Sequence, residues 1–198
     1  KTFPEPPTLF DDYEGRGSAA REAEMNILLH QNWAGDSKLY PEVMDELGIE
    51  PRSNWDKRAM ENSLNRFTNE QRKAWNEVYG PMNEEFKKIY PDMTEKDKMK
   101  WKYQRYMQDY LGCIAAVDES VGTLLDYLDE EGLTENTLVI FMGDNGYNLG
   151  RHGLMTKGNA VYLGTQVRRP NMFDSSAMIP MIFRWPGVIE PGTTCDAL

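Results

Sequence analysis

The most regular pattern of apolar and polar positions runs from Thr94 to Gly132. Thr94 is followed three residues later by Asp97, which is the spacing of a helical capping box. One helix, or two stacked ones, is predicted to start there. In its second half the apolar residues repeat at helical spacing while acidic residues take the other faces: Val117, Val121, Leu124, Leu125 and Leu128. Gly132 is a typical C-terminal stop, so we expect an amphipathic helix over residues 113–131.

Two continuous apolar runs follow this helix. Residues 138–142 lead into a Gly-Asp-Asn-Gly sequence, and residues 178–183 end shortly before a Trp-Pro-Gly sequence. An apolar run after an amphipathic helix is typical of a strand buried on both faces of a parallel sheet. We therefore predict an α/β fold in which these runs form neighbouring, buried, mostly parallel strands, with the helix of residues 113–131 packed across them.

The segments before Thr94 show weaker patterns. Residues 1–17 are rich in proline and glycine and are expected to be linker-like. A helix is predicted from Ser18 to about residue 32, with Ser18 as its N-cap and His30 in a structural role. Residues 38–92 are rich in Lys, Glu, Asn and Trp and are interrupted by prolines, which favours a surface insertion of short helices. Residues 94–198 would then hold the core helix, the strands and the loop that carries the chemistry.

Composition narrows the class of protein. The 198 residues are 40% apolar, which is typical of one globular domain and at most two. A net charge of −10 disfavours binding to nucleic acid, and no apolar run is long enough to span a membrane. Cys113 and Cys195 form no pair with metal-binding or redox spacing. The absence of an Asn-x-Ser/Thr triplet favours a bacterial source.

Asp144 and Asn145 directly follow the first apolar run. Ligands in open α/β sheets bind beyond the carboxyl ends of the strands, which is where these two residues are expected. A carboxylate beside an amide oxygen suits a hard cation such as calcium, whereas zinc or iron would favour histidine or thiolate ligands. The same sequence also suits a simple tight turn, and the pattern by itself leaves both interpretations open.

The next segment has an unusual charge distribution. Between Gly146 and Phe173 there is no acidic residue, while the window holds Arg151, His152, Lys157, Arg168 and Arg169. One interpretation is a pocket in which cations stabilise an anionic group and glycines allow close approach of the backbone. The alternative is a basic surface loop that acidic neighbours balance.

Residues 144–157 read Asp-Asn-Gly-Tyr-Asn-Leu-Gly-Arg-His-Gly-Leu-Met-Thr-Lys. This segment resembles, without a gap, the D-[NH]-G-x-x-L-G-x-H-G-x-x-x-K motif of the type I, formylglycine-dependent sulfatases of the alkaline-phosphatase superfamily. The resemblance extends upstream through residues 118–128 and downstream to Arg-Trp-Pro-Gly at residues 184–187, which is similar to the R-x-P-G end of a family strand. It implies part of an alkaline-phosphatase-like three-layer α/β/α sandwich.

The resemblance also implies roles for individual residues. Asp144 and Asn145 would be two ligands of one calcium ion, and Lys157 would contact the sulfate ester. His152 would be either a catalytic residue near the sulfate or the leaving oxygen, or a residue that supports the site from behind. The substrate would be a sulfated carbohydrate or an aryl sulfate. Its sugar or aryl group has several candidate contacts: Tyr147, Asn148, Arg151, Tyr162, Arg168 and Arg169.

The chain departs from the family pattern at the nucleophile. The C/S-x-P-x-R motif is absent, because Cys113 is followed by Ile-Ala-Ala-Val and Cys195 by Asp-Ala-Leu. The paired aspartates that complete the calcium site in the family are missing as well. The chain is therefore interpreted as the middle to C-terminal part of a sulfatase catalytic domain, inactive by itself, with uncovered sheet edges that favour self-association. The intact enzyme is expected to be periplasmic or secreted.

Two other classes remain open at this point. A phosphatase, phosphonate hydrolase or phosphoryl transferase of the same superfamily would share the fold, although these enzymes usually hold two transition metals through histidines, and Asn145 offers an amide instead. A non-catalytic module that binds calcium or polyanions is the second alternative. A C/S-x-P-x-R motif elsewhere in the intact protein would distinguish the enzyme from such a module.

Overall fold

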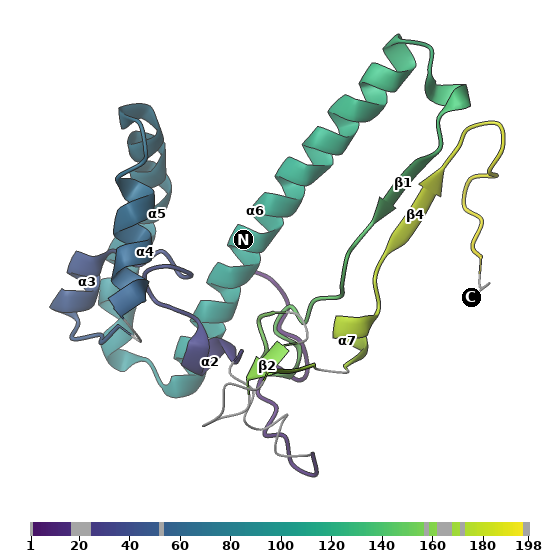
Figure 1. Ribbon diagram of the computed structural model, residues 1–198. Helices are drawn as coiled ribbons and strands as arrows, with labels where there is room; N and C mark the ends of the chain where they lie inside the picture. The colour runs from purple at the N-terminus through teal and green to yellow at the C-terminus, as the bar shows by residue number, and fades with distance from the viewer. Residues whose placement is uncertain are drawn as a thin grey trace.

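A computed structural model describes residues 2–16, 25–51, 54–156, 159–161, 168–170 and 173–195 (Figure 1). The described part begins with a segment of turns and irregular structure. The elements follow in this order: α2 (Ile27–His30), α3 (Pro41–Glu46), α4 (Asn54–Leu64), α5 (Asn69–Ile89), η1 (Tyr90–Asp92), α6 (Glu95–Glu130), η2 (Thr134–Asn136), β1 (Val139–Met142), η3 (Arg151–Gly153), β2 (Asn159–Val161), β3 (Arg168–Pro170), α7 (Asp174–Ala177) and β4 (Met181–Arg184).

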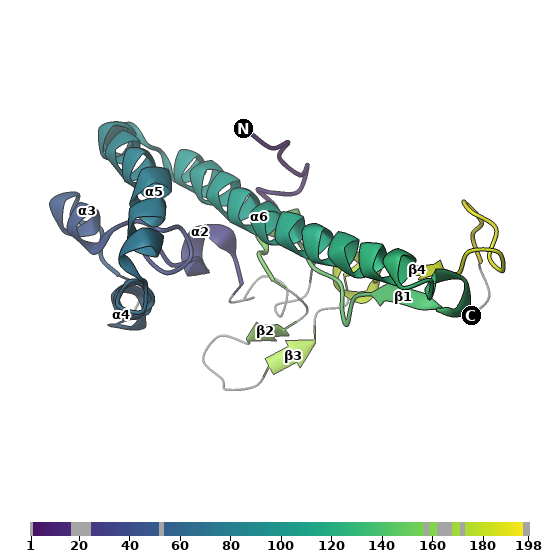
Figure 2. The same ribbon diagram turned by 90° about the horizontal axis from the view of Figure 1, so that it is seen from above.

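Helix α6 is the long axis on which the other elements are arranged. It runs for 36 residues as one helix, and Thr94 and Asp97 form the predicted capping box at its start. Gly132 adopts a left-handed φ of 67° just beyond its end, which confirms the predicted stop. Figures 1 and 2 show helices α3, α4 and α5 near the N-terminal end of α6, and the β1–β4 pair beside its C-terminal half.

The helices of residues 38–92 share a packed core, and their role as an insertion into the domain stays a prediction. Their core is aromatic and aliphatic, and it is centred on fully buried Phe86, whose ring packs at a tilt against the rings of Trp33 and Trp101. Helix α5 is 21 residues long and contains Pro81, a residue expected to interrupt it. The proline removes one backbone donor, but the apolar face of α5 is buried in this core, and that burial maintains the helix through the proline.

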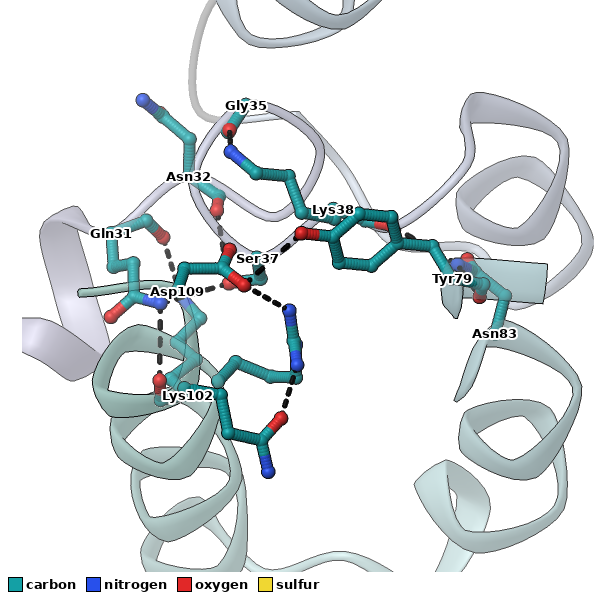
Figure 3. A network of polar contacts seen from close by, with 11 residues as sticks. Gln31, Asn32, Gly35, Ser37, Lys38, Tyr79, Asn83, Lys102 and Asp109 are labelled. Atoms are coloured by element: carbon teal, nitrogen blue, oxygen red, sulfur yellow. Dashed lines mark hydrogen bonds and ion pairs between the residues drawn. The ribbon is translucent and has the colours of Figure 1, made fainter. Parts of the chain in front are cut away.

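Buried polar groups connect this core to α6 (Figure 3). The Lys102 side chain is buried; its Nζ donates to the carbonyls of Leu28 (2.9 Å) and Gln31 (2.7 Å) and lies over the Trp33 ring. Gln31 Nε2 in turn donates to Ser37 Oγ and to the Lys102 carbonyl. A buried ammonium group is tolerated only when acceptors surround it, so this lysine fixes α2 against α6.

Residues 2–16, part of the segment expected to be linker-like, pack against α6. Leu9 is buried with Ile27, Met99 and Tyr103 in a second apolar cluster. The backbone of Phe3 is bonded at both its N–H and its carbonyl by Gln104, 101 residues away. The chain is thus held along the helix by specific contacts.

The helix predicted from Ser18 falls partly on residues 17–24, which lie outside the described residues. In the described part α2 starts only at Ile27, and Asn26 caps it by accepting from the N–H groups of Leu28 and Leu29. His30 accepts a hydrogen bond from the Asn26 N–H at Nδ1, 3.1 Å away.

Strands β1 and β4 are neighbours, as predicted, but they are antiparallel, and the prediction of parallel strands is wrong. Val139 pairs with Arg184 and Met142 with Met181. A parallel pair needs a crossover connection, usually a helix. The described residues between these strands hold only short elements, among them α7 and the antiparallel pair β2–β3. Strand β4 therefore begins beside the C-terminal end of β1 and runs in the opposite direction.

The predicted burial of these strands under α6 is not found within this chain. Phe141 and Ile182 on the strands are exposed, and so are Val117 and Leu124 on the second half of α6. A two-stranded ribbon is too narrow to bury a helix face. Among the described residues, no helix has both the length and the apolar character needed to cross a bilayer.

Candidate active site

The loop after β1 is fixed to the segment before β4 by backbone hydrogen bonds. The Gly143 N–H donates to the Pro180 carbonyl (3.2 Å) and the Gly146 N–H to the Ser176 carbonyl (2.9 Å). Gly146 is buried so closely against α7 that a Cβ atom there would lie 2.3 Å from the Ser175 carbonyl oxygen. The loop and α7 therefore form one packed unit at the carboxyl end of β1.

A methyl group at position 146 is expected to force this unit apart. Gly146→Ala should lower the free energy of unfolding of the complete protein by about 1–3 kcal/mol, the usual cost of overpacking. Gly122→Ala is the matched control, because a Cβ on that α6 glycine meets nothing within 4 Å and alanine is the better helix former. Denaturant unfolding checks the pair; equal stability of the two variants would contradict the packing described.

Asp144 and Asn145 lie where the sequence predicts, directly after β1. The Asp144 side chain is exposed, and Asn145 is partly buried with its Nδ2 donating to the Gly146 carbonyl (2.7 Å). That bond leaves Oδ1 as the atom that Asn145 can offer to a cation. Within the described ranges there is no group of three or more His, Cys, Asp or Glu side chains suited to a metal, and a calcium role for Asp144 and Asn145 stays a prediction.

Asn148 is buried and holds the loop together. Its Nδ2 donates to the Thr156 carbonyl (2.6 Å), and its Oδ1 accepts from Ser175 Oγ (2.6 Å). Its backbone N–H also donates to the Thr156 carbonyl. Both polar ends of the side chain are used inside the chain, and contact between Asn148 and a substrate stays a prediction.

The turn that carries His152 has several residues in the left-handed region. Leu149, Gly150, His152 and Gly153 all have positive φ. Gly150 is the one where side-chain space is decisive, because a Cβ atom there would lie 2.5 Å from the Tyr103 ring. The glycines thus let the turn lie directly on α6.

The His152 ring is held on two sides. Its Nδ1 lies 2.7 Å from Asp11 Oδ2 and 3.0 Å from Arg16 NH1, and its ring stacks on Phe173 with centroids 4.1 Å apart. Burial by itself would raise the pKa of Asp11, but the hydrogen bonds from His152 and the Tyr13 N–H, with the charge of Arg16, outweigh it and hold that pKa below its usual value. Asp11 therefore stays ionised to lower pH than an exposed aspartate.

The remaining candidate residues lie around this turn or outside the described part. Arg151 is exposed, and the Tyr147 ring stacks on Tyr106 and Tyr110 of α6. Arg168 lies in β3 opposite Val161, and Arg169 lies opposite Ala160; their side chains are outside what is described, as are Lys157 and Tyr162. The backbone just before Lys157 is placed by a bond from the Met155 N–H to the Met25 carbonyl (2.9 Å).

Asp11, Arg16 and Phe173 are the contacts that the sequence did not indicate. They reach His152 across as many as 141 residues, and the first two lie in a segment whose prolines suggested a linker. No local spacing could have paired them with the turn. The signal that was present is the adjacent carboxylates of Asp11 and Asp12 in an otherwise turn-rich stretch.

The sulfatase family model matches residues 56–196, more than half of the chain. The chain belongs to the sulfatase family. An N-acetylglucosamine-6-O-sulfatase from Bacteroides thetaiotaomicron is 36% identical over 198 residues, which covers 99% of this chain and 31% of that protein. Human arylsulfatase H is 37% identical over 94 residues, which covers 46% of this chain and 16% of that protein.

A solved structure of BT4656 in complex with its substrate, D-glucosamine-2-N,6-O-disulfate, superimposes on this sulfatase-family chain with a TM-score of 0.78. The two are 35% identical, and the match covers 97% of this chain and 35% of that one. The chain thus spans about a third of the length of the relatives that it matches from end to end. The likeness confirms the predicted α/β fold of the alkaline-phosphatase type.

Proposed function

We propose that the complete protein hydrolyses a sulfate ester of a sulfated carbohydrate, and that the ester lies at the 6-position of a glucosamine-type sugar. The observation that carries this proposal is identity of 35–36% along nearly the whole chain with proteins described as acting on such sugars. The matched length includes the loop with Asp144, Asn145 and His152. A phosphatase of the same superfamily is the competing function that the test below separates.

The residues of the loop supply the chemistry in this proposal. Asp144 and Asn145 would hold a calcium ion together with further oxygen ligands, and bound calcium would withdraw negative charge from the sulfate oxygens. Lys157 would contact the sulfate, and Arg151, Arg168 and Arg169 would contact the sugar or its other anionic groups. The nucleophile of the family, a formylglycine, would come from outside these 198 residues.

The test is release of sulfate by the complete protein. N-acetylglucosamine-6-sulfate should be hydrolysed. The 3-sulfate isomer should react far more slowly because its ester lies at another position of the sugar, and N-acetylglucosamine-6-phosphate should react far more slowly because its ester group carries a different charge. Ion chromatography of free sulfate and phosphate measures all three reactions. Faster release of phosphate would establish the competing function and refute this one, and equal rates on both sulfate isomers would refute the proposed position.

A further inference from the structure

Asn145 and Gly146 form the one Asn-Gly pair in the sequence. In such a pair the backbone nitrogen of the glycine can attack the side-chain carbonyl carbon of the asparagine, and the glycine has no side chain to hinder the approach. Asparagine is therefore among the residues that change chemically with heat and time. This pair lies in the loop directly after β1, so the reaction would alter the candidate site.

The attacking nitrogen is engaged in the folded loop. The Gly146 N–H donates to the Ser176 carbonyl of α7 at 2.9 Å. The amide must lose this proton before its nitrogen can attack, and a backbone amide that is hydrogen-bonded in this way gives up its proton to solvent only when the structure opens locally. The Gly146 nitrogen is therefore a nucleophile only when α7 and the loop separate.

Packing around Gly146 leaves no room for a smaller movement. A Cβ atom at this position would lie 2.3 Å from the Ser175 carbonyl oxygen and 2.7 Å from the Met178 carbonyl oxygen. The Asn145 side chain is fixed as well, because its Nδ2 donates to the Gly146 carbonyl (2.7 Å). A rotation that brings the Gly146 nitrogen onto Asn145 Cγ would break the bond to Ser176 and collide with α7.

A side-chain hydrogen bond helps to hold α7 against the loop. Ser175 Oγ donates to Asn148 Oδ1 at 2.6 Å, whereas Ser176 Oγ lies 3.4 Å from the same atom. Asn148 is buried, and its Nδ2 is bonded to the Thr156 carbonyl, so its Oδ1 is a fixed acceptor. Loss of the Ser175 hydroxyl would loosen α7 without changing the Asn-Gly pair itself.

We infer that Asn145 is a latent deamidation site that α7 keeps unreacted. When α7 separates from the loop, a bond forms between the Gly146 nitrogen and Asn145 Cγ, the bond between Cγ and Nδ2 breaks, and Nδ2 takes a proton from water and leaves as ammonia. Water then opens the cyclic imide and leaves aspartate or isoaspartate at position 145. The product adds a second carboxylate beside Asp144. This inference does not depend on the function proposed above.

The rate of deamidation in the complete protein tests the inference. The folded protein should react at position 145 at least about a hundredfold more slowly than a peptide of residues 142–150, because a reaction that needs an opened state follows the population of that state. Mass spectrometry of digested samples measures aspartate and isoaspartate over time. The protection should persist both with added calcium and with a chelator, because it is assigned to α7.

Two serine variants make the test specific. Ser175→Ala removes the bond to Asn148 and should raise the deamidation rate about five- to tenfold, which is what the loss of one buried hydrogen bond provides. Ser63→Ala removes an exposed hydroxyl of α4 that donates to the Ala59 carbonyl (2.9 Å) and should leave the rate unchanged. Hydrogen exchange of the Gly146 amide should rise together with deamidation in Ser175→Ala, and in the wild type in urea below its unfolding transition.

Three results would overturn the inference. The first is deamidation of the folded protein at the rate of the peptide, or protection that appears only with added calcium. The second is an equal rate in Ser175→Ala and Ser63→Ala. The third is exchange of the Gly146 amide that rises in urea without a matching rise in deamidation. If Ser175→Ala does not fold, the comparison in urea decides the question, because it uses the wild-type protein.

Discussion

Lys157→Ala in the complete protein is expected to lower kcat/KM by about a hundred- to a thousandfold on every sulfate ester, which is the usual cost of removing one preorganised charge from a site. The reason is electrostatic. Lys157 lies in a stretch of the sequence without acidic residues, so its ammonium group would face the oxyanion without a competing carboxylate from that stretch. Negative charge grows on the departing oxygen during hydrolysis, and a fixed cation stabilises it.

The control for this prediction is Lys73→Ala, which removes an exposed lysine of α5 that pairs only loosely with Glu77, at 3.9 Å. Its rate should equal that of the wild type. Arg168→Ala and Arg169→Ala should discriminate among sugars and affect a small aryl sulfate much less, since they are proposed to contact the sugar. Initial rates on both substrate types give these values. A wild-type rate in Lys157→Ala would show that Lys157 does not contact the sulfate and that its match to the motif is accidental.

Asp144→Ala is expected to weaken calcium binding to the complete protein by more than about a hundredfold, because even residues behind the metal ligands cost ten- to a hundredfold when they are changed. Asp144 is the charged member of the pair, and the neutral amide of Asn145 cannot replace its charge. Turnover should fall together with affinity. Calorimetric titration with calcium measures the affinity directly, without reference to the reaction.

Two variants make the calcium experiment specific. Asp144→Asn keeps an oxygen ligand while losing the charge, so its affinity should lie between those of the wild type and Asp144→Ala. Asp118→Ala removes an exposed carboxylate of α6 and should leave the titration unchanged. Equal calcium affinity in the wild type and Asp144→Ala would exclude this aspartate as a ligand.

The features predicted correctly from the sequence are those that local spacing determines. The capping box at Thr94 and the stop at Gly132 involve residues a few positions apart, and a helix is built from such contacts. The antiparallel pairing of β1 with β4 is different, because it depends on the path of the chain between them. The apolar runs show that strands exist but carry no information about direction.

The candidate site divides in the same way. The motif identified the loop and placed Asp144 and Asn145 at the strand end. It could not show that both polar ends of the Asn148 side chain form hydrogen bonds within the chain. Nor could it pair His152 with Asp11, since that contact depends on how residues 2–16 pack along α6. Contacts between side chains more than a hundred residues apart in the sequence, such as that of His152 with Asp11, can be identified only from the three-dimensional structure.

The buried ammonium of Lys102 has a practical consequence for chemical labelling. Acylating reagents attack the unprotonated, solvent-accessible amine, and this amine lies between two carbonyl groups and the Trp33 ring. Lysines such as Lys73, which are exposed on the helix surface, would be modified first. The rate at which Lys102 becomes modified therefore reports how often α2 separates from α6, and mass spectrometry of the labelled peptide can follow that opening without an engineered probe.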